Sequence, residues 1–172
     1  VGIGSVLAGL LSAGKVELGL VPVGATGITI SSLLLYVAGQ SVDPSLPPMD
    51  QTAFYWACAC LMSLGVASGF FDVPLEANLQ HRSDPAKLGT ILAATNFLTF
   101  SFIMLASVLF FVLKTVIGMS PDTIFMVAGL ITIPVIIYAF KMLPQATIRF
   151  VVWLFSFFVY RIRVIGRENV LT

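Results

Sequence analysis

Charged residues are scarce in this chain. Asp, Glu, Lys and Arg make up 10% of its 172 residues, whereas hydrophobic residues make up 58%. An average globular domain is about 25% charged, so the composition excludes an ordinary soluble protein. The apolar runs are continuous, without the alternation of a membrane β-barrel. We therefore expect an all-α membrane protein.

Groups that perform catalysis or bind metals are equally scarce. His81 is the only histidine, which argues against Ser/His/Asp chemistry and against a histidine-rich metal site. Cys58 and Cys60 are two residues apart and would lie on different faces of a helix, so we interpret them as packing residues. The few basic residues are scattered, unlike a nucleic-acid interface. We expect no catalytic residue, metal, cofactor or nucleic-acid partner.

Four uncharged runs are long enough to cross a bilayer as helices. A helix needs about 18 to 20 apolar residues to do so, and the runs cover residues 18–42, 51–71, 88–113 and 123–140. Residues 1–14 form a shorter uncharged run without an initiator Met or a basic leader. We interpret this run as the end of a fifth helix, and the chain as a fragment of a longer protein.

The basic residues predict the topology. Alternate connectors hold eight of the nine Lys and Arg residues, and the connector 41–50 holds none. Basic connectors remain in the cytoplasm by the positive-inside rule. A multi-pass protein with both ends of this chain in the cytoplasm is therefore expected. The eight residues are Lys15, Arg82, Lys87, Lys141, Arg149, Arg161, Arg163 and Arg167.

The character of the chain changes after Lys141. Only eleven uncharged residues, rich in Phe, separate Arg149 from Arg161, too few to cross a bilayer. An aromatic stretch with basic flanks is typical of a helix that lies in the membrane interface. We predict such a helix over residues 144–160. The following "RIRVIGRENV" alternates like a strand, so residues 161–172 are predicted to begin a soluble domain.

Two acids and a proline follow the second full span. Asp72 and Glu76 are predicted near the cytoplasmic end, because a helix that begins at about Thr52 has risen roughly 30 Å by Phe71. Pro74 lacks an amide donor and can act as a hinge. Two readings of the acids remain open: solvated carboxylates at a helix end, or a cytoplasmic gate that contacts a headgroup.

Small and polar side chains inside the spans predict helix contacts. Gly65 and Gly69 are four residues apart, as are Ala59, Ser63 and Ala67, a spacing that allows close helix approach. Asn96 in the third full span needs a polar partner in hydrocarbon. That partner is either a neighbouring helix or a wet translocation path.

Three segments carry a family resemblance. "GSVLAGLLSAGKVELGLVPVGA" (4–25), "GFFDVPLEANLQHRS" (69–83) and "GTILAATNFLTF" (89–100) resemble the carboxy-terminal half of major facilitator superfamily transporters, most of all the bacterial lysophospholipid transporter group. The resemblance implies a partial helical bundle. Residues 1–143 would hold the end of helix 8 and helices 9 to 12 of such a transporter.

The resemblance also implies site residues. Gly9, Gly14 and Lys15 are similar to the superfamily's cytoplasmic loop motif, although Ser12 stands near the position of its acidic residue. Resemblance supports Gln80 more than the acids, because members differ at those two positions. The residues expected to bind substrate or gate its path are Asp72, Glu76, Gln80, Arg82 and Asn96.

The tail resembles the beginning of a different domain. "YRIRVIGRENV" (160–170) is similar to the lead-in of a glycerolipid acyltransferase domain. The implied protein moves lysophospholipids across the bacterial inner membrane, where a fused cytoplasmic acyltransferase restores their second chain. Its implied partners are the bilayer, an amino-terminal transporter half and that acyltransferase. A transporter of another solute, and a membrane anchor without transport, remain alternatives.

Overall fold

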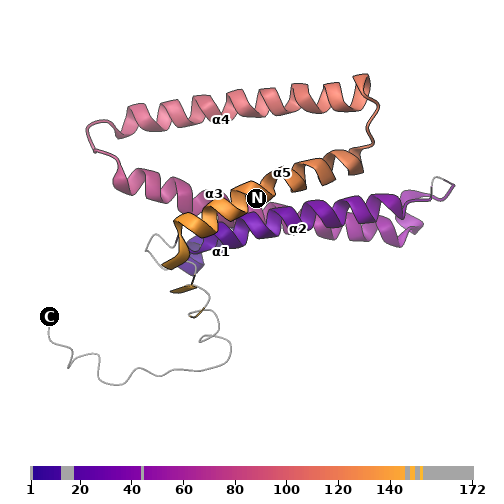
Figure 1. The fold of residues 1–172 in the computed structure, drawn as a ribbon, viewed down its shortest axis with the longest axis horizontal. Helices are drawn as coiled ribbons and strands as arrows, with labels where there is room; N and C mark the ends of the chain where they lie inside the picture. The colour runs from indigo at the N-terminus through magenta and orange to yellow at the C-terminus, as the bar shows by residue number, and fades with distance from the viewer. Residues whose placement is uncertain (1, 13–17, 44, 146–147, 150–151, 153–172) are drawn as a thin grey trace.

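The chain folds into helices throughout the part that the structure describes. The computed structural model describes residues 2–12, 18–43, 45–145, 148–149 and 152, and none of these forms a strand. The helices are α1 (Gly2–Ser12), α2 (Leu20–Gln40), α3 (Thr52–Arg82), α4 (Leu88–Phe111) and α5 (Pro121–Met142), shown in Figure 1. A short 3₁₀ helix, η1 (Pro48–Asp50), precedes α3, and a π-helical turn, η2 (Val112–Val116), follows α4.

The long helices match the predicted spans. Helices α2, α3 and α5, and helix α4 together with the η2 turn that continues it, are each long and apolar enough to cross a membrane. The all-α fold of the described residues and the four predicted apolar helices of membrane-spanning length are therefore confirmed. Helix α1 lies within residues 1–14, the run predicted to be the end of a fifth helix.

Helix α3 is longer than predicted. It has 31 residues and continues through Pro74 to Arg82, eleven residues beyond the predicted span of residues 51–71. Pro74 is fully buried, and membrane helices tolerate a proline whose surroundings are packed. At 1.5 Å per residue the helix is about 46 Å long, whereas the hydrocarbon core is about 30 Å thick. One end of α3 must therefore extend beyond the hydrocarbon.

Helix α2 lies between two neighbours. Helices α3 and α5 both pack along α2, and α1 packs against α3 (Figure 1). The buried residues Ala53, Cys60, Ala67 and Pro74 of α3 recur every seven positions. This repeat keeps one seam of a helix facing its neighbour. The described helices thus form a row in the order α1, α3, α2, α5.

Hydroxyl pairs join the helices of this row. Ser31 of α2 donates a hydrogen bond to Ser63 of α3 at 3.1 Å. On another side of α2, the hydroxyls of Thr29 and Thr132 of α5 are hydrogen-bonded. Such bonds satisfy polar groups that hydrocarbon would leave unpaired, and they contribute modestly to helix association.

Glycines let the backbones of the row touch. A Cβ on Gly24 would lie 2.5 Å from the Phe71 nitrogen and 2.8 Å from the Ala67 carbonyl oxygen of α3. A Cβ on Gly69 would lie 2.5 Å from the Gly4 carbonyl carbon of α1. The predicted small-residue contacts are confirmed at Ser63, Ala67 and Gly69. Ser63 and Ala59 are both exposed, but only Ser63 forms a side-chain hydrogen bond to α2.

Helix α4 stands apart from the row. None of its residues is buried, and Figure 1 shows it running alongside the row without packing along α3 or α5. Large side chains such as Phe97 and Phe100, each 72% exposed, point away from protein neighbours. Its apolar surface is therefore open to lipid or to other protein.

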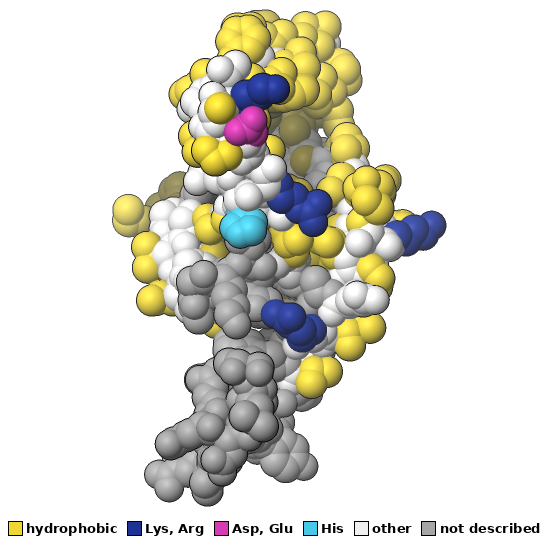
Figure 2. Space-filling view, turned by 90° about the vertical axis from the view of Figure 1, so that its left-hand side faces the viewer, with side chains coloured by type: hydrophobic (Ala, Val, Ile, Leu, Met, Phe, Trp, Pro, Cys, Tyr) yellow, Lys and Arg dark blue, Asp and Glu magenta, His cyan; other side chains and the backbone are white. Residues whose placement is uncertain are grey.

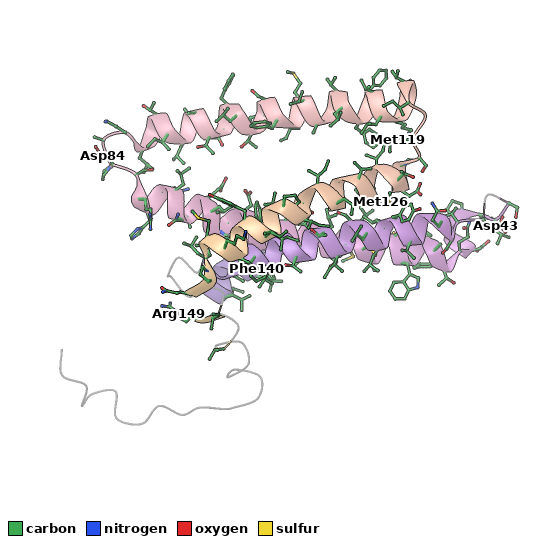
Figure 3. The ribbon with its side chains drawn as sticks, viewed as in Figure 1. Asp43, Asp84, Met119, Met126, Phe140 and Arg149 are labelled. Atoms are coloured by element: carbon green, nitrogen blue, oxygen red, sulfur yellow. The ribbon has the colours of Figure 1, made fainter. Side chains whose placement is uncertain are left out.

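The two ends of the molecule differ in charge. Asp84 and Arg149 lie at one end and Asp43 and Met119 at the other (Figure 3). Figure 2 views the Asp84 end, where dark-blue Lys and Arg side chains lie around the single His. Of the described basic residues only Lys114 belongs to the Asp43 end. Successive connectors thus lie at alternate ends of the molecule, and the connectors rich in Lys and Arg share one end, as the charge pattern predicts. We call these the basic end and the acidic end.

Candidate functional site

Three of the predicted site residues share one face of α3. Asp72, Glu76 and Gln80 are four residues apart and exposed. Each helical residue advances about 100°, so both acids point away from the side on which Pro74 is buried. These polar side chains therefore lie at the basic end, on the side of α3 that does not pack against α2.

The two acids have no cation partner in the described part of the chain. Arg82 and Lys87 follow them at the same end, yet neither forms an ion pair with Asp72 or Glu76. Lys15, the third candidate cation, lies outside the described residues. Two carboxylates one helical turn apart repel each other mildly, so they favour a cation from another part of the protein or from a ligand.

Asn96 lies on the helix that stands apart. Its side chain is exposed and makes no hydrogen bond within the described residues. Nearby, Thr95 donates to the Ile91 carbonyl of its own helix. The structure does not pack Asn96 against the acids of α3, because α4 does not run in contact with α3. A polar partner for Asn96, on a neighbouring helix or along a wet translocation path, therefore stays a prediction.

The remaining predicted residues are only partly described. Gly9 is exposed on α1, and nothing lies within 4 Å of a Cβ built there. Gly14 and Lys15 of the loop motif fall outside the described residues. So do residues 161–172 and most of the predicted interfacial helix 144–160, although residues 144–145, 148–149 and 152 are helical.

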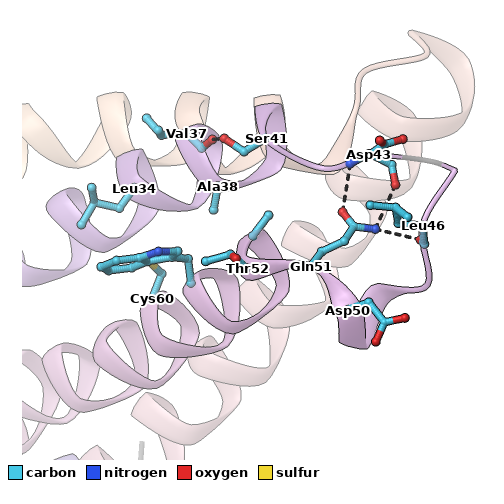
Figure 4. Close-up of a pocket in the computed structure, with 12 residues that line it drawn as sticks. Leu34, Val37, Ala38, Ser41, Asp43, Leu46, Asp50, Gln51, Thr52 and Cys60 are labelled. Atoms are coloured by element: carbon cyan, nitrogen blue, oxygen red, sulfur yellow. Dashed lines mark hydrogen bonds between the residues drawn. The ribbon is translucent and has the colours of Figure 1, made fainter.

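A cavity between α2 and α3 was not predicted. It lies at the acidic end and has a volume of about 680 Å³. Figure 4 shows apolar Leu34 and Cys60 toward one side and Asp43 and Asp50 toward the other. The sequence signal was a connector with two acids and no cation, followed six residues later by a tryptophan. The lining residues are Leu34, Val37, Ala38, Ser41, Asp43, Leu46, Asp50, Gln51, Thr52, Ala53, Trp56 and Cys60.

Gln51 holds the connector that closes this cavity. Its side-chain oxygen accepts a hydrogen bond from the Asp43 amide at 2.9 Å. Its side-chain nitrogen donates to the carbonyls of Asp43 at 2.9 Å and Leu46 at 2.8 Å. Gln51 is buried although its neighbours are exposed. This one side chain therefore links both ends of the connector between α2 and α3 through three hydrogen bonds.

Asp43 remains ionised in this loop. The Ser45 hydroxyl donates to its carboxylate at 2.7 Å, and the Ser45 amide donates at 2.9 Å. These bonds favour the charged form and lower the pKa of Asp43 below its ordinary value. The contribution of this carboxylate to the loop is present at neutral pH and is lost as the pH falls through the lowered pKa.

Replacing Gln51 with leucine is expected to lower the free energy of unfolding by about 1 kcal/mol, because three hydrogen bonds to the loop are lost while water can still reach the exposed partners. The loop should also become more sensitive to protease. Unfolding in mixed micelles and limited proteolysis measure both effects. Ser107→Ala is the control, since that hydroxyl bonds only to the Ile103 carbonyl of its own helix. Equal behaviour of the two variants would contradict the role of Gln51.

Comparison with known proteins identifies no relative: no family model, curated protein or solved structure matches this chain. The described residues form a helical protein with four helices long and apolar enough to cross a membrane, a cavity at the acidic end, and a polar face at the basic end that has no partner among those residues.

Proposed function

We propose that this chain is the carboxy-terminal part of the major facilitator domain of a lysophospholipid transporter. The transporter would move lysophospholipids across the bacterial inner membrane to a fused cytoplasmic acyltransferase. The observation that carries the proposal is the exposed polar face of α3, formed by Asp72, Glu76 and Gln80. Packing within the described chain leaves these groups available for a substrate or a second transporter half.

The two segments of strongest family resemblance support this assignment. Residues 69–83 and 89–100 form the end of α3 and the beginning of α4, so they meet at one hairpin at the basic end. That end would face the cytoplasm under the positive-inside rule. Such a location would put the exposed polar face where a headgroup is released to an acyltransferase.

The chemistry of the cargo suits such a structure. A lysophospholipid has a polar head that must cross the bilayer and one acyl tail that can stay in hydrocarbon. A few polar groups beside a lipid-facing surface would serve it, and α4 supplies an exposed apolar surface of that kind. Superfamily members rock two six-helix halves about a central site, so residues 1–172 alone should not transport.

The test is uptake of labelled lysophosphatidylethanolamine by spheroplasts. Cells that express the full-length protein should take up the label above an empty-vector control, whereas cells that express residues 1–172 should not. Absence of uptake by the full-length protein would contradict the proposal. Uptake of a non-lipid solute instead would favour a transporter of other cargo. If deleting the membrane domain only released the acyltransferase from the membrane, the anchor alternative would be favoured.

A further inference from the structure

The cavity at the acidic end is polar on one side and apolar on the other. Asp43 and Asp50 line it from the connector, while Leu34, Val37 and Cys60 line it from the helices (Figure 4). We propose that this cavity binds a single-chain amphiphile with an ammonium head, which lies by the two carboxylates while the tail lies between α2 and α3. The proposal does not rest on transport, because the polar face of α3 lies at the opposite end.

The depth of the cavity fits the upper part of one alkyl chain. Thr52 and Cys60 both line it and are eight residues apart on α3, a rise of about 12 Å. Leu34 of α2 and Ser41, the residue that follows α2, also line it and are seven residues apart, a rise of about 10 Å. The two helices give the same depth independently. A volume of about 680 Å³ is within the range of small-molecule sites.

Aromatic residues place the mouth of the cavity at headgroup level. Tyr55 ends the first turn of α3, Trp56 begins the second, and these side chains are 62% and 64% exposed. Exposed Tyr and Trp near a helix end are typical of the boundary between headgroups and hydrocarbon. Trp56 lines the cavity, and an indole attracts ammonium groups through its π face. An amphiphile could therefore enter from the bilayer with its head already at the correct level.

The charges select the sign of the head. Both acids line the cavity, and its lining contains no Lys or Arg. The whole connector 41–50 lacks basic residues. An ammonium head would thus meet two carboxylates, whereas a sulfate or phosphate head without an amine would be repelled. Because Asp50 and Asp43 are exposed, the attraction should weaken as salt is added.

The test uses Trp56 as a reporter. The chain contains two tryptophans, Trp56 and Trp153, so Trp153→Phe leaves a single indole on the cavity wall. The full chain is reconstituted in nanodiscs of zwitterionic lipid and titrated with a sixteen-carbon trimethylammonium amphiphile whose chain carries quenching bromines. The same chain with a sulfate head is the matched probe. We expect saturable quenching with a lower Kd for the ammonium probe, and a rise of that Kd in high salt.

Variants separate binding from partitioning into the bilayer. Asp50→Asn, alone or with Asp43→Asn, should raise the Kd of the ammonium probe by up to about tenfold and leave that of the sulfate probe unchanged or lower. Asp84→Asn at the basic end is the matched control and should change neither Kd. Val37 lines the cavity and is 59% exposed, so Val37→Phe can place a larger side chain there. This variant should raise the Kd of both probes.

The results that overturn the proposal are equally specific. Equal Kd values for the two probes, or quenching that rises without saturation, would show partitioning into lipid only. If the Kd of the ammonium probe were unchanged in the Asp43→Asn, Asp50→Asn variant, the two carboxylates would not contribute to binding. If that double variant failed to fold, Asp50→Asn alone decides the question, because Asp50 is exposed and its side chain has no hydrogen bond within the described residues.

Discussion

Replacing Gly24 with alanine is expected to lower the free energy of unfolding by about 1 to 3 kcal/mol, the usual range for overpacking. The new methyl group would lie 2.5 Å from the Phe71 nitrogen and 2.8 Å from the Ala67 carbonyl oxygen. Both are backbone atoms of α3, so no side-chain rotation can relieve the contact. The two helices must separate, which weakens the whole seam between them. Unfolding in mixed micelles measures the loss.

The matched control is the same substitution on the helix that stands apart. Nothing lies within 4 Å of a Cβ built on Gly89 in the first turn of α4, and alanine favours a helix over glycine by up to about 1 kcal/mol, the value for an interior position. Gly89→Ala should therefore be neutral or stabilising. Gly24→Leu should lower the free energy of unfolding more than Gly24→Ala does. If all three variants unfolded like the parent protein, α2 and α3 would not approach as closely as the structure shows.

The double substitution Asp72→Asn, Glu76→Gln is expected to reduce lysophospholipid uptake by at least about tenfold, equivalent to 1.4 kcal/mol of lost interaction. The two amides keep the size of the side chains and their capacity to hydrogen-bond, but they remove both charges. A gate that closes on a cation, or a site that holds an ammonium headgroup, requires those charges. Uptake by spheroplasts that express equal amounts of full-length protein is the measurement.

Asp84→Asn is the control for this double variant. Asp84 lies at the same end, in the turn between α3 and α4, where its carboxylate accepts a hydrogen bond from the Ala86 amide. It should leave uptake unchanged. Normal uptake by the double variant would favour the simpler reading, in which Asp72 and Glu76 are solvated carboxylates at a helix end. A loss in both variants would indicate a general effect of negative charge at the basic end.

The spans and their alternation could be predicted because lipid allows few solutions. An uncharged run in hydrocarbon must satisfy its own backbone hydrogen bonds, and a helix does this within one segment. The end of α3 was harder to predict. Asp72 and Glu76 suggested that the helix would soon end, whereas a helix needs only its own backbone bonds and can continue beyond the hydrocarbon to Arg82. The first charged residue after an apolar run is therefore a better guide to the edge of the hydrocarbon than to the end of the helix.

The cavity and the helix pairs depend on information that no single segment carries. Ser31 and Ser63 are 32 residues apart, and Thr29 and Thr132 are 103 apart. Spacing within one helix predicts which face is small or polar, but not which neighbour that face meets. The capacity of Gln51 to hold a loop likewise depends on where the Asp43 and Leu46 backbones lie.

The row of helices has a consequence for the order in which the chain assembles. Contacts between α2 and α3 are close in sequence and can form as soon as both helices are in the membrane, whereas α5 must wait until α4 has also been synthesised. Until then, no helix of the described residues covers the Thr29 side of α2. Docking of α5 is thus expected to be the slow step of folding, and α4, which is long and apolar enough to cross a membrane, tethers α5 to the row during that step.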